Sequence, residues 1–376
     1  MTANLRFGEY LKTGDSIARN GLFLNAGGHV TSLKWLPRLF RAHDVEDDVD
    51  FLAATVLRGR NGASSLINHP RLAFLDKNTS KLEDFSHGIQ IWKYESATSH
   101  FSLYKFYLIE NWGVCSDISW APVRSPSSTL GYLCGIFAGK LLVFKIPTND
   151  SESSPELAII VEPSYIYQID DPKDSTLGLT CYNFLGNDRV IVGLLNGSIA
   201  EFLLPIEGQV NEDSKIPSFV FSVTEAIITS ITVGERDPGK YTIIVNSAGS
   251  RCFALEYNDF QHGRVDSWAT NSFVQPTYNG NLKIFITDDA ADTVQYSYIK
   301  HPSDKATMAM KVDGTITALH LLQVLQHPLI LNGTSTGEIN VLNVARKILH
   351  GGKATNKTTV PLKLWKFSKE EENIMI

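Results

Sequence analysis

Short apolar segments bounded by turn residues recur along the 376-residue chain. Five of them carry a central glycine: SHGIQIWKYE around Gly88, FAGKLLVFKI around Gly139, LNGSIAEFLL around Gly197, SAGSRCFALEY around Gly249 and STGEINVLNV around Gly337. Each predicts a strand, a tight turn and a second strand, because a turn glycine supplies the positive φ that a short hairpin needs. The gap after Gly249 leaves room for one more unit, whose turn we expect at Asp288, Asp289 and Ala290.

A second pattern precedes the hairpins. HVTSLKWLP at 29 to 37 returns as VCSDISWAP at 114 to 122. We expect these segments to be the innermost strands of blades, with Trp35 and Trp120 as buried rings that close an apolar face rather than as ligand-stacking rings. Later runs such as 141 to 144, 190 to 195 and 241 to 245 are apolar without alternation, which is typical of strands buried on both faces.

Repeated four-stranded units with a period of about 40 to 58 residues predict an all-β, WD40-like β-propeller. Six blade units are visible in the sequence, and seven blades are also compatible with it. We expect a lead-in at 1–20, a single propeller domain at 21–367 and a tail at 368–376. The strands GLFLNAGG and PLKLWKF lie outside the regular hairpins, and either could complete a blade by pairing the two ends of the chain. An insertion at about 58–86 is either a functional loop or an extra strand pair.

Composition indicates a reducing compartment. The four cysteines are spread singly through apolar runs, without CxxC pairs. No apolar run reaches the roughly 18 residues of a membrane span, and the first residues do not resemble a signal peptide. We therefore expect a cytosolic or nuclear protein.

A search for chemistry favours a non-enzymatic protein. GERDPGKY at 234 to 241 has the spacing of a phosphate loop, but Tyr241 replaces its Ser or Thr and a strand follows in place of a helix. No HExxH, GxSxG or close His pair occurs, so we predict no catalytic residue, metal site or cofactor. The carboxylates at 44 to 50 and 288 to 292 are interpreted as solvated turns, since neither has the spacing of a calcium loop.

Charge is unevenly distributed along a chain of net charge −6. Basic residues gather in two regions that are candidates for nucleic-acid or partner contact: Arg38, Arg41, Arg58, Arg60 and Arg71 near the first blade, and Arg346, Lys347, Lys353 and Lys357 near the C-terminus. An ordinary solvated loop face is the alternative for each region.

NWGVCSDISWAP followed by LGYLCGIFAGKLLVFKIP resembles the WD-repeat subunit of the RNA polymerase III general transcription factor TFIIIC, the tau complex. GLFLNAGGHVTSLKWLP is similar to that family's first-blade entry, and PLKLWKF to its closing strand. The resemblance is clearest over 21–147 and 313–367. It implies a nuclear scaffold subunit that supports recognition of the internal promoter of tRNA genes. The implied partners are a large DNA-binding subunit, a second propeller subunit and, within the complex, promoter DNA.

Two other functions remain open from the residues alone. One is a WD-repeat scaffold of an unrelated complex, in chromatin assembly or trafficking, without a nucleic-acid role. The other is an enzyme with a site in the central channel, which is disfavoured because no polar constellation recurs at the strand starts.

The sequence shows no helix that could enter a DNA groove, so the isolated chain should bind duplex DNA only weakly.

Overall fold

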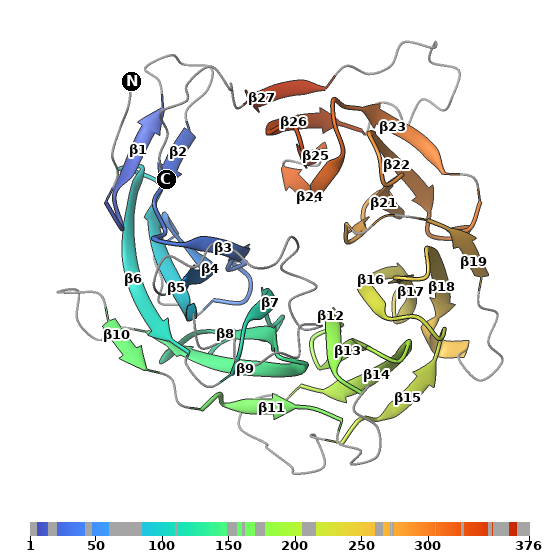
Figure 1. Ribbon diagram of the computed structural model, residues 1–376, viewed down its shortest axis with the longest axis horizontal. Helices are drawn as coiled ribbons and strands as arrows, with labels where there is room; N and C mark the ends of the chain where they lie inside the picture. The colour runs from blue at the N-terminus through green and yellow to red at the C-terminus, as the bar shows by residue number, and fades with distance from the viewer. Residues whose placement is uncertain are drawn as a thin grey trace.

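Six sheets of four or five strands surround a central axis in the computed structural model, and each sheet forms one blade of a β-propeller (Figure 1). The elements of the described part of the chain are β-strands and a 3₁₀ turn, Tyr257–Asp259. The structure describes residues 6–13, 21–41, 47–59, 85–109, 112–148, 156–159, 162–169, 177–204, 216–259, 266–270, 272, 274–304, 306–324, 327–344, 348 and 361–366.

Each blade starts with the strand nearest the axis and continues outward (Figure 1). Blade 1 contains β3 (His29–Trp35), β4 (Val49–Gly59), β5 (Phe85–Glu95), β6 (His100–Leu108) and β10 (Glu156–Ile159). Blade 2 contains β7 (Cys115–Trp120), β8 (Thr129–Phe137), β9 (Lys140–Pro147) and β11 (Tyr165–Tyr167). Blade 3 contains β12 (Leu179–Leu185), β13 (Arg189–Leu194), β14 (Ser198–Leu203) and β15 (Phe219–Ser222).

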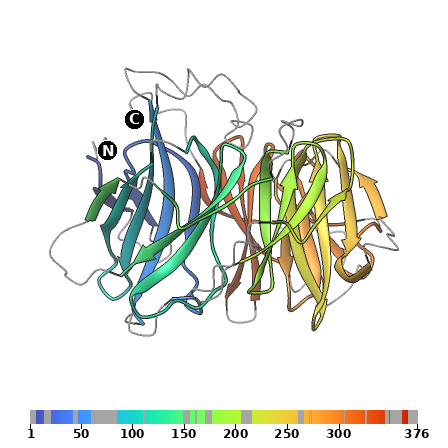
Figure 2. The same cartoon turned by 90° about the horizontal axis from the view of Figure 1, so that it is seen from below.

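The second half of the ring repeats this order. Blade 4 contains β16 (Ile228–Asp237), β17 (Lys240–Ser247), β18 (Arg251–Glu256) and β19 (Asp266–Ala269). Blade 5 contains β20 (Thr277–Asn279), β21 (Ile284–Asp288), β22 (Thr293–Tyr298) and β23 (Thr307–Lys311). Blade 6 contains β24 (Ile316–Val324), β25 (His327–Thr334), β26 (Glu338–Asn343) and β27 (Leu362–Lys366). Seen edge-on, the strands run between the two flat faces of the ring, roughly along its axis (Figure 2).

The core lies between the blades, because neighbouring sheets pack face to face. The apolar runs noted in the sequence form β9, β13 and β17, which are middle strands with almost fully buried side chains. One cluster of buried residues joins blades 1 and 2, a second joins blades 2 and 3, and a third joins blades 5 and 6. Burial on both faces explains why these strands lack the alternation of polar and apolar residues.

Hydrogen bonds from side chains to neighbouring blades reinforce this packing. Trp120 Nε1 donates to the Lys34 carbonyl at 3.1 Å, and Tyr182 Oη donates to the Cys134 carbonyl at 2.9 Å. Asn183 Nδ2 reaches the Ile231 carbonyl across the next boundary, at 3.1 Å. Tyr278 Oη donates to the Glu235 carbonyl at 2.5 Å, so blades 4 and 5 are joined in the same way. Polar tips of buried rings thus find partners on the adjoining sheet.

The glycine turns follow the sequence pattern at most positions. Gly197 has φ +84°, and a Cβ there would lie 2.0 Å from the Thr224 carbonyl oxygen, so glycine is required on two counts. The expected turn at residues 288 to 290 is also confirmed, between β21 and β22, with Ala290 at φ 66°. The prediction for Gly88 is wrong, because Gly88 lies inside β5, opposite Val56, and no turn occurs there. Glycine is needed at this position because a Cβ would meet the Phe106 ring at 2.5 Å.

A two-stranded sheet, β1 (Tyr10–Thr13) paired with β2 (Gly21–Leu24), lies between blade 6 and blade 1 (Figure 1). The sequence pattern predicted β2 but not β1. The C-terminal strand β27 completes blade 6 by pairing with β26. The two ends of the described chain meet through the rings of Phe23 and Trp365, whose centroids lie 4.7 Å apart. The fold is therefore a propeller of six blades, with a two-stranded hairpin at the junction of the first and last.

Trp35 and Trp120 occupy equivalent places in blades 1 and 2 but differ in burial. Trp120 is 3% exposed in the core between the two blades, as predicted. Trp35 is 49% exposed, so its assignment to the core is wrong. Trp35 lies on the face of blade 1 that points away from blade 2, where no four-stranded blade covers it. The same motif thus gives a core residue or a surface residue according to whether a full blade packs against its face.

We expect Trp120→Ala to lower the free energy of unfolding by about 3 to 5 kcal/mol, through lost burial and a cavity. Trp35→Ala should cost only about 1 to 2 kcal/mol, because half of its ring already contacts solvent. Urea denaturation of both variants measures the difference. Equal losses would show that the exposed face of blade 1 is covered in solution.

Candidate functional site

An aromatic cluster, with Trp35 exposed and Tyr94 and Phe101 half-buried, lies on the face of blade 1 that points away from blade 2. The Trp35 ring lies 6.2 Å from Tyr94 and 6.1 Å from Phe101, and those two rings are 4.8 Å apart. Leu33, two residues before Trp35 on the same face of β3, is 52% exposed. The hairpin covers the remainder of this face, where Phe7 packs edge-on against the buried ring of Trp92 at 6.2 Å. Exposed rings beside a covered core are typical of surfaces that bind protein partners.

Blade 6 exposes apolar side chains on the face that points away from blade 5. Ile330 and Leu342 face blade 5 and are buried in the shared core. Residues one position along the same strands therefore face the opposite way. On that side Leu322, Ile339 and Leu362 are exposed. We call Leu33, Trp35, Tyr94, Phe101, Leu322, Ile339 and Leu362 the apolar surface of blades 1 and 6.

The structure describes two of the nine basic residues that the sequence offered as contacts, and the backbone of a third. Arg38 is half-exposed and forms a two-pronged salt bridge with Asp50, through Nε–Oδ1 and Nη2–Oδ2 distances of 2.8 Å. Arg41 is only 7% exposed, and its guanidinium donates to the Val49 carbonyl at 2.6 Å and to Asp47 at 3.0 Å. Both guanidinium groups thus have partners within blade 1. The backbone of Arg58 pairs with Ser86 in the β4–β5 ladder. The side chain of Arg58, and all of Arg60, Arg71, Arg346, Lys347, Lys353 and Lys357, lie outside the described residues.

Two further lysines near the C-terminus, Lys363 and Lys366, form salt bridges with a carboxylate that is distant from them in the sequence. Lys363 Nζ and Lys366 Nζ lie 2.7 and 3.1 Å from Glu338 Oε1, across the β26–β27 ladder. The Glu338 side chain is fully buried beneath them. The hydrogen bond from Lys363 is the main reason that the pKa of Glu338 is lowered, and the hydrogen bond from Lys366 adds to it. These lysines therefore fasten β27 to blade 6.

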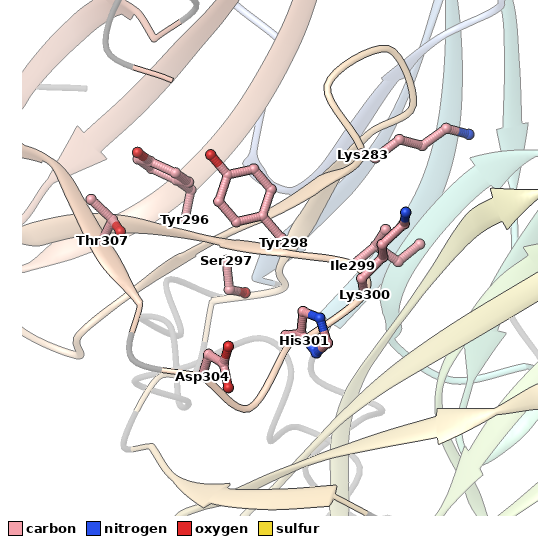
Figure 3. A pocket seen from close by; sticks show the side chains of 9 residues that line it. All are labelled: Lys283, Tyr296, Ser297, Tyr298, Ile299, Lys300, His301, Asp304 and Thr307. Atoms are coloured by element: carbon pink, nitrogen blue, oxygen red, sulfur yellow. The ribbon is translucent and has the colours of Figure 1, made fainter. Parts of the chain in front are cut away.

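Two adjoining pockets open beside blade 5. The first, of about 440 Å³, lies at the end of β22 and is lined by Lys283, Tyr296, Ser297, Tyr298, Ile299, Lys300, His301, Asp304 and Thr307 (Figure 3). Tyr296 and Tyr298 point to one side of the strand and Ser297 to the other (Figure 3). Lys283 is already engaged, since its Nζ donates to the Glu235 carbonyl at 2.8 Å. The first pocket thus combines the tyrosines of β22 with charged side chains of both signs, Lys283, Lys300 and Asp304, which lie outside the strands.

The second pocket, of about 380 Å³, lies between blades 4 and 5. Its walls come from β17, β18 and β19 on one side and from β21, β22 and the following turn on the other. Sequence reasoning missed it, because its polar side chains come from segments that are distant along the chain. It shares Ser297 and Asp304 with the first pocket.

Other kinds of chemistry have little support in the described part of the chain. There, no group of three or more His, Cys, Asp or Glu side chains could hold a metal ion. The four cysteines form no disulfide, and burial raises the pKa of the Cys115, Cys134 and Cys252 thiols, which keeps them protonated. No helix among the described residues has the length and apolarity to span a membrane.

Comparison with solved structures identifies the class of fold. The fold is that of β-propellers, and two solved structures align with it at low identity. Chaetomium thermophilum Raptor gives a TM-score of 0.54 at 10% identity, over 84% of this chain and 24% of its own. A putative 6-phosphogluconolactonase from Bacteroides fragilis gives 0.52 at 11% identity, over 92% of this chain and 84% of its own. At such identity these structures show the fold alone. No model of a known protein family matches the chain.

A curated relative gives more particular information. The transcription factor tau 91 kDa subunit of Saccharomyces cerevisiae is 24% identical over 375 residues. The match covers 95% of this chain but 51% of the yeast protein, so the chain spans about half the length of the curated relative it matches. The similarity extends through all six blades, including the middle of the chain, where the sequence motifs are weak.

Acid should weaken the attachment of β27. Glu338 has a lower pKa in the folded protein than in the unfolded chain, so its contribution to stability is present above its ordinary pKa and lost as pH falls through the lowered value. Glu338→Gln should therefore lower the unfolding midpoint at neutral pH and have little effect in strong acid. Thermal unfolding of both proteins across this range measures the change. A constant difference at every pH would contradict an electrostatic role.

Proposed function

We propose that this chain is a non-enzymatic scaffold subunit of a TFIIIC-type transcription factor, which supports recognition of the internal promoter of tRNA genes and transcription by RNA polymerase III through protein-protein contacts. Similarity to the yeast tau 91 kDa subunit along 95% of the chain supports this assignment. So does the resemblance of the Trp-Pro segments and of the closing strand to that family's WD-repeat subunit. A nuclear location follows from the same proposal.

The observation that carries the scaffold role is the apolar surface of blades 1 and 6. Its leucines, its isoleucine and Trp35 are exposed, and Tyr94 and Phe101 are half-buried, on blade faces whose equivalents elsewhere in the ring pack against another blade. Burial of apolar area contributes roughly 25 cal/mol per Å², so covering such a surface favours association. We propose that another subunit of the assembly covers it, in keeping with the large DNA-binding subunit or the second propeller subunit expected from the resemblance.

The surface can be tested by removing its most exposed ring. Trp35→Ser together with Leu33→Ser should abolish co-purification with the partner subunits, because both side chains are about half exposed on this surface. Val220→Ser on β15 is a matched control, since Val220 is a similarly exposed apolar residue on a different blade. Retained association of the double variant, with the fold intact, would remove this surface from the interface. Co-purification with an unrelated chromatin or trafficking complex would overturn the TFIIIC assignment itself.

DNA contact is proposed only within the assembly. The net charge of −6 disfavours strong binding by the chain alone, whose non-specific affinity should be about 10⁻⁴ to 10⁻⁶ M or weaker at physiological salt. Within the assembly, Arg58, Arg60, Lys353 and Lys357 would contact phosphates, which position a protein without reading sequence.

Reversing these four charges should lower the affinity of the assembly about equally for specific and random DNA and flatten its dependence on salt. A salt titration of DNA binding, with and without the reversals, measures the effect. An unchanged dependence of the DNA affinity on salt concentration would show that these residues do not contact DNA. Sequence-specific binding by the isolated chain would mean that it has a recognition element of its own.

A further inference from the structure

The pocket between blades 4 and 5 begins where the core between these blades turns polar. Ile244, Cys252 and Phe285 are buried in a shared cluster, with Trp268 packed against it. Two residues further along the same strands, and so on the same faces, Ile244 is followed by Asn246 and Phe285 by Thr287. A cavity of about 380 Å³ opens at this change. Its floor is thus an extension of the inter-blade core, with amide and hydroxyl groups where apolar side chains would otherwise meet.

Several polar groups of the pocket have no hydrogen-bond partner among the residues that the structure describes. Asn246 is only 2% exposed, and its side-chain amide forms no hydrogen bond with the described residues. The side chains of Thr287 and Gln295, which are half-buried and opposite each other on β21 and β22, also form no hydrogen bond with the described residues. Buried amides are normally hydrogen-bonded, because leaving one unpaired costs about 1 to 3 kcal/mol. Unpaired groups gathered around one cavity therefore indicate a bound polar ligand.

The charged residues of the pocket have one sign. Its lining includes Asp288, Asp289 and Asp304, and no Lys, Arg or His. The Asp289 carboxylate accepts hydrogen bonds from the Ala291 and Thr293 N–H groups of its own turn, each at 3.0 Å. Asp288 is 4% exposed and accepts hydrogen bonds from the Ser272 hydroxyl and from the Ala290 N–H at 2.9 Å. Burial raises the pKa of Asp288 in spite of these bonds. Asp304 is exposed at the mouth, and its carboxylate has no ion-pair partner among the described residues. A cation in the cavity would weaken the electrostatic repulsion between Asp288 and Asp289 and lower the free-energy cost of burying the Asp288 carboxylate.

We propose that this pocket binds an arginine side chain of a partner protein. A guanidinium is flat, carries five N–H donors and is weakly hydrated, so it suits a slot between two sheets that offers amide and carboxylate oxygens together. The indole of Trp268 supplies an aromatic face in the same lining. A lysine ammonium would make fewer of these contacts, since it is compact and strongly hydrated.

This site is independent of the proposed assembly. It lies on blades 4 and 5, whereas the apolar surface lies on blades 1 and 6, and its chemistry does not depend on which complex contains the chain. A failure of the arginine site would leave the scaffold proposal untouched, and the reverse also holds.

Ligand-observed NMR with small model compounds tests the proposal directly on the full chain. N-acetyl-arginine amide should bind with a dissociation constant on the order of 1 mM, as expected for a single side chain. N-acetyl-citrulline amide, the neutral isostere, should bind at least about tenfold more weakly, because it lacks charge-assisted hydrogen bonds. Binding of citrulline as strong as that of arginine would overturn the proposal. Equal binding of N-acetyl-lysine amide would overturn the choice of guanidinium.

Two variants locate the binding. Asp304→Asn removes the exposed carboxylate and Asn246→Leu removes the unpaired amide, and each should weaken arginine binding severalfold. Glu225→Gln is the matched control, since it removes an exposed carboxylate of the connection between blades 3 and 4 that does not line the pocket. Thermal unfolding verifies that each variant is folded. Binding unchanged in both pocket variants would place the site elsewhere, and stronger binding of free L-arginine than of the amide would indicate a metabolite rather than a protein partner.

Discussion

Each sheet of this propeller buries both of its faces only if another sheet stands on either side of it. Blades 2 to 5 meet that condition, and this is why their middle strands are apolar without alternation and why buried rings such as Trp120 and Tyr182 hydrogen-bond to the carbonyls of the adjoining blade. Blades 1 and 6 meet it on one side only. Between them stands the β1–β2 hairpin, which covers Trp92 and reaches Trp365 but leaves other apolar side chains exposed.

The constraint also explains which features could be predicted from the sequence. Strand, turn and strand are local patterns, so the hairpins around Gly139, Gly197 and Gly337 and the turn before Ala290 follow from a few neighbouring residues. The period of these patterns allows six or seven blades, and the structure has six. The family resemblance rests on equally local motifs, and the similarity to the yeast subunit agrees with it.

The remaining features depend on neighbours that are distant in sequence. Trp35 and Trp120 end the same motif, yet only the second is covered by a further blade, and no local pattern distinguishes them. Gly88 resembles a turn glycine but is fixed by the Phe106 ring across the sheet. Lys363 and Lys366 belong to a run without acidic residues and still share Glu338, which lies on the neighbouring strand. The pocket beside Asn246 is assembled from two blades in the same way.

The two proposed contact regions use the ring differently. The apolar surface exists because two blades lack a full neighbour, so covering it substitutes for part of a missing sheet and should be tight and largely insensitive to salt. The pocket of blades 4 and 5 lies across the ring from that junction (Figure 1) and depends on charge and hydrogen bonds, so a contact there should be weaker and selective for one side chain. Face-to-face packing makes the intervening blades rigid, and a partner anchored at one region would hold a second partner at the other in a fixed orientation. A ring with such a division of roles is suited to arranging other subunits rather than to catalysis.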